Sequence, residues 1–142
     1  MKIIQRLMAL LIFITISSFA WPHSPGKQAK VYFKNLKNGD TISTPYKVEF
    51  GIEGYGIVPA GTKDKRRHTA GHHHLLVDVE DMPDLDEPIP ADARHLHFDQ
   101  GETEMTLDLP PGKHTLQLLL GDEDHEPTDP PLISDKITIT VE

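Results

Sequence analysis

Apolar and polar side chains alternate along six short stretches of this chain. In an extended strand neighbouring side chains point to opposite faces, so a period of two predicts a strand with one buried face. Turn signals such as Asn38-Gly39 and Pro111-Gly112 separate the stretches. The positions predicted to face the core are Val31 and Phe33; Val48, Phe50 and Ile52; Leu75, Val77 and Val79; Met105, Leu107 and Leu109; Leu116, Leu118 and Leu120; and Ile137, Ile139 and Val141.

Short strands joined by glycine- and proline-rich turns are typical of an all-β fold, an antiparallel β-sandwich of the immunoglobulin-like type. We expect one such domain over residues 30–142, because a chain of this length suffices for one core. Two predicted connections, residues 54–71 and 80–94, are long. Long loops in compact domains often carry function, and both of these lead into histidine clusters.

The N-terminal residues have the layout of a secretory signal peptide. Lys2 and Arg6 precede the apolar run 7–16, and the small residues Ser18 and Ala20 follow it. The run is shorter than the roughly 20 residues that a membrane-spanning helix needs, so we expect cleavage after residue 20 and no membrane anchor in the mature protein. Residues 21–29 are then a flexible linker. The predicted location is the periplasm or the exterior of the cell.

Composition narrows the possible partners and chemistry. The formal net charge is −8, and removal of residues 1–20 leaves 12 basic against 22 acidic side chains, or about −10. An acidic protein is a poor ligand for nucleic acid. The chain has no cysteine, which excludes disulfides, thiolate catalysis and a lipoprotein anchor.

Histidine is the residue type that suggests a function. All nine histidines lie beyond the predicted signal peptide, and five fall in the runs 72–74 and 95–97. Residues i and i+2 of a strand share one side, about 6.6 Å apart along the chain, so a His-x-His pair can bring two imidazoles onto one ion. With Leu75 facing the core, His73 points inward. The predicted chelating pairs, each on the polar side of its strand, are His72 with His74 and His95 with His97.

His125 lies in the acidic run 121–127 and is a candidate fifth ligand, with Asp122 or Asp124 orienting a ring from outside. A solvated acidic turn is the alternative interpretation of this run. His114 begins an apolar strand, and we expect it to be a packed, hydrogen-bonded residue at the edge of the core. The basic run 63–68 is interpreted as a solvated loop, although it is also suited to docking an anionic partner.

A set of motifs is spread along nearly all of the predicted mature chain. These are Val31-Tyr32-Phe33, Gly71 to Asp78, Pro88 to Asp92, His95 to Phe98, Gly101 to Glu104, Pro111 to Leu116, and Gly121-Asp122 with His125. Together they resemble a bacterial exported family catalogued as domain of unknown function 4399. The resemblance implies an exported, sandwich-like domain in which the histidine motifs are the hallmark.

Three functions remain open from the sequence. The leading hypothesis is a periplasmic protein that binds a divalent ion, Cu(II) or Zn(II), because imidazole suits both. The alternative is a non-metal interaction module of the cell envelope, whose loops contact a protein or a polysaccharide. A third is a zinc hydrolase, which needs a pocket and a general base such as Glu102 or Asp99. The sequence contains no serine-nucleophile motif and no phosphate-binding glycine loop, so no catalytic residue is assigned.

Overall fold

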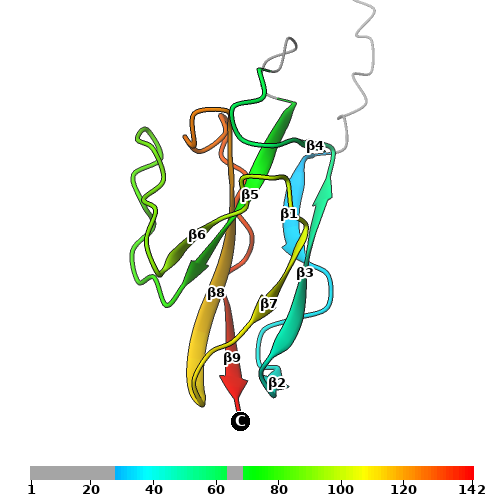
Figure 1. Ribbon diagram of the computed structural model, residues 1–142, viewed down its shortest axis with the longest axis vertical. Coiled ribbons are helices and arrows are strands. Elements are labelled where there is room, and N and C mark those ends of the chain that lie inside the picture. Colours follow the sequence, from blue (N-terminus) through cyan, green and yellow to red (C-terminus); the bar gives the residue numbers. More distant parts are fainter. Residues whose placement is uncertain (1–27, 64–68) are drawn as a thin grey trace, which may run out of the picture.

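The computed structural model describes residues 28–63 and 69–142 (Figure 1). The predicted signal peptide, most of the predicted linker and residues 64–68 of the basic run lie outside the described residues. Strands, turns and loops make up the described part of the chain, which holds no helix. Accordingly, none of these residues forms a helix long and apolar enough to cross a membrane.

Two sheets form the layers of a β-sandwich (Figure 1). The smaller sheet has the antiparallel order β1-β3-β7, with β1 at Lys30–Phe33, β3 at Tyr46–Glu53 and β7 at Glu104–Leu107. The larger sheet has the order β2-β9-β8-β5-β4, and β6 also pairs with β5. Its strands are β2 (Thr41–Ile42), β4 (Gly56–Ile57), β5 (Ala70–Val77), β6 (His95–His97), β8 (Gly112–Gly121) and β9 (Ile137–Val141).

The predicted β-sandwich is therefore confirmed, and its six predicted strands are β1, β3, β5, β7, β8 and β9. The three further strands are short, and two of them pair in parallel, β2 with β9 and β4 with β5. The prediction extended β5 to Val79, but the strand ends at Val77. Asp78 adopts a left-handed φ of 54°, and its Oδ1 accepts the backbone N–H of Thr115 at 2.9 Å, which stops the pairing there.

The main core lies between the two sheets and consists of the side chains that the alternation predicts. Val48 and Phe50 of β3 belong to the same buried cluster as Leu75 of β5, Leu118 of β8 and Ile139 of β9. Each such side chain contributes about 1.5–3 kcal/mol of burial free energy. The apolar interior thus gives the domain a core that does not depend on the histidine clusters.

The outer face of the larger sheet is buried as well. Leu76 of β5 and Leu119 of β8 point away from the main core, yet they are 2% and 0% exposed. The segment after β8 pairs with the edge of β8, Leu119 with Ile133 and Gly121 with Pro127, and its residue His125 places a ring against those of His72 and His74 on the outer face of β5. In Figure 1 this segment, in orange, lies beside the upper part of β5. The central strand β5 is therefore covered on both sides, which the sequence did not indicate.

His114 occupies the predicted position at the edge of the core. Its Nδ1 donates to Oδ2 of Asp78 and its Nε2 donates to the carbonyl of Pro110, both at 2.8 Å. A carbonyl oxygen can only accept a hydrogen bond, so Nε2 is the donor to Pro110. The hydrogen bond to the Asp78 carboxylate raises the pKa of His114. The hydrogen bond between His114 and Asp78 ties the start of β8 to the end of β5.

Candidate metal centre

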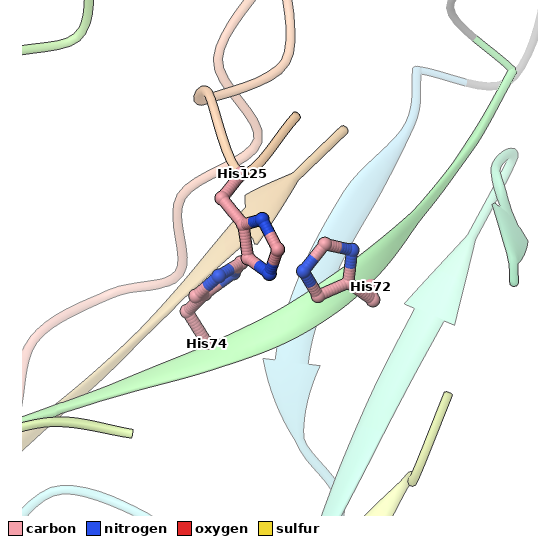
Figure 2. A group of neighbouring side chains, drawn as sticks. All are labelled: His72, His74 and His125. Atoms are coloured by element: carbon pink, nitrogen blue, oxygen red, sulfur yellow. The ribbon is translucent and has the colours of Figure 1, made fainter. Parts of the chain in front are cut away.

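Two imidazoles of β5 meet a third from a loop (Figure 2). His72 and His74 lie on the outer face of β5, with ring centroids 4.6 Å apart. His125, in the loop after β8, has its centroid 4.8 Å from that of His72 and 5.9 Å from that of His74. One ring nitrogen from each of the three lies within 4.8 Å of the others. The rings thus converge from two elements that are about 50 positions apart in the sequence.

The sequence placed His72 and His74 on the polar side of their strand, and that expectation is wrong. Both residues are 0% exposed. The i, i+2 spacing does put the two rings on one side, but the rings of His97 and His125 lie against them there, and neither residue is exposed to water. A pair expected at the surface is in fact an interior feature.

The backbone of His125 is held in an unusual conformation that directs its ring to the cluster. Its φ is 65°, a left-handed value that costs a non-glycine residue roughly 1–2 kcal/mol. Asp122 fixes the turn, because its Oδ1 accepts the backbone N–H groups of Asp124 and Glu126 at 2.9 and 3.1 Å. The carbonyl of His125 accepts the N–H of Ile89 at 2.9 Å. Strain of this kind concentrates at functional sites.

His97 of β6 completes a group of four imidazoles. It is the register partner of His74, and its ring centroid lies 4.3 Å from that of His74 and 5.1 Å from that of His125. Its Nε2 is 2.8 Å from the carbonyl oxygen of Pro90. Because a carbonyl only accepts, Nε2 carries the proton and Nδ1 keeps its lone pair. Metal-binding histidines typically use one nitrogen in this way and offer the other to the ion.

Asp99 places one carboxylate oxygen among these rings. Its Oδ1 is 3.1 Å from Nε2 of His125, and 3.8 Å from both Nε2 of His72 and Nδ1 of His97. The ligand atoms of His97, Asp99 and His125 also lie within 4.8 Å of one another. A second possible group of ligands therefore overlaps the first and shares His125 with it.

The buried rings lack hydrogen-bond partners. Among the described residues, no atom forms a hydrogen bond with either ring nitrogen of His72 or of His74. Leaving a buried polar group unsatisfied costs about 1–3 kcal/mol, and most buried polar groups in folded proteins have a partner. A bound metal ion would supply a partner for one nitrogen of each ring, since it accepts the lone pair of that nitrogen directly.

Burial also sets the protonation state of the cluster. Removal from water, together with the neighbouring imidazoles, lowers the pKa of His72 to about 4 and that of His74 to about 2. The two rings are therefore neutral over the physiological range. Neutral imidazole is the form that binds metal.

Glycines make room for the imidazoles. A Cβ at Gly121 would collide with Cε1 of His74, and a Cβ at Gly71 would collide with the carbonyl oxygen of Gly121. The ring of His74 thus occupies space that exists only because the facing strand has no side chain at that point. The close approach of the Gly121 carbonyl accounts in the same way for Gly71, the glycine directly before the histidine run of β5.

The remaining candidates from the sequence lie elsewhere. His73 points inward as expected, with its ring 5.2 Å from that of Phe50, and burial lowers its pKa to about 4. His95 does not belong to either group of possible ligands; its Nδ1 donates to Oδ1 of Asp92 at 2.8 Å. Asp122 orients the backbone of the turn through its two N–H contacts and does not hydrogen-bond a ring.

Three further acidic residues were candidates from the sequence. Asp124 contributes its backbone N–H to the turn. Within the described part of the chain, its side chain forms no hydrogen bond or ion pair with an imidazole. The carboxylate of Glu102, considered as a general base, accepts the N–H of Gln100 at 2.9 Å. Asp99, considered only as a base, is the acidic side chain that reaches the rings. The one signal in the sequence that could have placed Asp99 near the rings was its position two residues after His97.

Residues 48–142 match the family described as Domain of unknown function (DUF4399), and the chain belongs to that family. The match includes every histidine and acidic residue of the two groups. Comparison with curated proteins and with solved structures finds no match. The family description assigns no activity, so a functional assignment rests on the site itself.

Proposed function

We propose that this DUF4399 protein is an exported, periplasmic protein that binds one divalent transition-metal ion, Cu(II) or Zn(II). The proposed ligands are His72, His74, His97 and His125. The observation that carries the proposal is the pair of fully buried imidazoles whose nitrogens have no hydrogen-bond partner among the described residues. Export is supported by the N-terminal sequence alone, with its basic residues, apolar run and small residues.

The type of ligand favours Cu(II) or Zn(II). Imidazole nitrogen suits both ions, whereas Mg²⁺ and Ca²⁺ prefer oxygen. Zn–N bonds of about 2.0–2.1 Å set tetrahedral ligand nitrogens about 3.3 Å apart. The nitrogens of His72, His74 and His125 lie within 4.8 Å of one another, so modest rotations of the side chains bring them to that spacing.

Ion binding is better supported than hydrolysis at this site. A catalytic zinc centre keeps one coordination position open to water and substrate. Here His72 and His74 are both 0% exposed, and the imidazoles of His125 and His97 lie beside them. The non-metal interaction module remains the competing function, and it requires that no ion depends on these histidines.

The variant His125→Gly separates a ligand role from a structural one. Glycine adopts the left-handed φ without strain, so the free energy of unfolding of the metal-free protein should change by no more than about 1 kcal/mol. Affinity for Cu(II) and Zn(II) should fall at least about 100-fold, since even outer-sphere residues of metal sites contribute 10–100-fold. Urea unfolding and calorimetric titration of protein without a histidine tag measure the two quantities.

His95→Gln is the matched control for this experiment, because it removes an imidazole of a neighbouring element that lies outside the ligand groups. Its metal affinity should equal that of the unmodified protein. If His125→Gly binds both ions as tightly as the unmodified protein does, the metal-binding proposal fails and the interaction module takes its place.

A further inference from the structure

Solvent exposure increases in one direction across the cluster. The side chain of His72 is 1% exposed, that of His97 is 13%, that of His125 is 32%, and that of Asp99 is 50%. His74 is 0% exposed. An ion in solution therefore meets Asp99 and His125 before it can reach His72 or His74.

Asp99 lies close enough to three of the imidazoles to contact an ion beside any of them. Its Oδ1 lies between 3.1 and 3.8 Å from a ring nitrogen of His125, of His72 and of His97. Adjacent ligand atoms on one ion are separated by about 3 Å when metal–ligand bonds are 2.0–2.2 Å. The carboxylate is thus within ligand spacing of His125 already and within a small movement of the other two.

We propose that Asp99 is an entry ligand: an incoming divalent ion first binds at an outer position formed by His97, Asp99 and His125. It then moves inward by exchanging Asp99 for His72 and His74 while it keeps His97 and His125. This inference rests on the proposed function, since it describes how the ion reaches the same histidines. It assigns an outer metal position and a carboxylate role in addition to the four-histidine set.

The exchange is balanced in charge and atoms. The incoming aqua ion releases water molecules as Asp99, His97 and His125 bind. The Nε2 proton of His125, which the carboxylate of Asp99 now accepts at 3.1 Å, passes to solvent while Nδ1 takes up a proton, so that the ring stays neutral and Nε2 offers its lone pair to the metal. In the second step the metal–oxygen bonds to Asp99 and to one remaining water molecule break as bonds to His72 and His74 form. No oxidant or other reactant is needed.

Asp99→Asn tests the entry role because the amide keeps the shape of the side chain but is a much weaker ligand. If Asp99 acts only in transit, the association and dissociation rates of Zn(II) should both fall by about tenfold. The equilibrium affinity should then change by less than about threefold, because the inner ligands are intact. Stopped-flow mixing with Zn(II) and a competing chromophoric chelator measures the rates.

Asp124→Asn is the control, because it removes the same charge from the neighbouring acidic turn without removing a possible ligand. Its rates should change by less than about twofold at moderate ionic strength, where charge effects between exposed groups are screened. A fall equal to that of Asp99→Asn would mean that general electrostatic attraction explains the rates, which would overturn the entry role.

The outcomes separate this inference from the proposed function. Equal rates in Asp99→Asn and the unmodified protein would overturn the entry role alone. A faster dissociation with a matching loss of affinity would make Asp99 a permanent ligand and also overturn it. Two Zn(II) ions bound tightly to one chain would contradict the exchange, because the two positions share ligands. Failure of the unmodified protein to bind Zn(II) or Cu(II) would overturn the proposed function itself.

Discussion

Replacing His97 by alanine should lower the affinity of this protein for Cu(II) and Zn(II) by at least about 100-fold. His95→Ala should leave the affinity unchanged. The two residues are a matched pair: both lie in β6, their side chains are 13% and 14% exposed, and each donates one hydrogen bond. Only His97 has a ring nitrogen within one of the ligand groups. Calorimetric titration of both variants measures the difference.

Coupling between His74 and His97 extends this test. If both hold the same ion, the double variant should lose little more affinity than either single variant, because the first substitution already dismantles the site. Additive losses would indicate two separate weak sites. Equal affinities in His95→Ala and His97→Ala would contradict the assignment of His97 as a ligand.

The metal-free domain should lose stability steeply as the pH falls from about 6.5 towards 4. The folded protein holds His72 and His73 neutral down to a pKa of about 4 and His74 down to about 2. In the unfolded chain each has a pKa of about 6.5. The unfolded state therefore binds up to three more protons, and the free energy of unfolding should drop by about 4 kcal/mol per pH unit near pH 5.

The direction of this dependence follows from the sign of the shifts. A lowered histidine pKa has no effect on stability above the unfolded pKa, and below that pKa it destabilises the folded state, because the unfolded chain binds the proton more readily. His114 has a raised pKa, and its contribution is fully present below about pH 6.5, so it does not offset the loss. The loss reaches about 6 kcal/mol at pH 5, so a total stability near the lower end of the usual range of roughly 5–15 kcal/mol places the acid transition of the metal-free domain near pH 5.

Urea unfolding in the presence of a chelator, repeated from pH 7.5 to 4.5, measures this dependence. The variant His74→Leu removes one of the three buried groups, so its slope with pH should be about two thirds of the original. Bound Zn(II) should move the acid transition to lower pH, because the ion binds only the folded state. A stability that stays level between pH 7 and 5 would contradict the buried, neutral imidazoles.

The strands and the main core were predictable because alternation reports directly on one buried face. Val48 and Phe50 on β3, and Leu116 and Leu118 on β8, are buried where the period of two places them. The same period correctly put His72 and His74 on one side of β5, opposite His73. Local spacing thus determined which side chains share a side.

The environment of the site was not predictable, because it depends on contacts between distant segments. The rings that lie against His72 and His74 come from His97 of β6 and from His125, which stands in a run of prolines and acidic residues that has no period. The separation of His95 from His97 follows from hydrogen bonds to Asp92 and Pro90, which no spacing rule supplies. Asp99 lies in a turn between strands, and its approach to three imidazoles appears only in three dimensions.

X-ray absorption at the metal edge of protein loaded with one equivalent of Zn(II) or Cu(II) tests whether the four imidazoles hold the ion. We expect three or four nitrogen ligands at about 2.0–2.1 Å, with the multiple-scattering pattern of imidazole, and a lower imidazole count in His125→Gly. A shell of oxygen ligands with no imidazole scattering would contradict metal binding by these histidines, as would a spectrum that His125→Gly does not change.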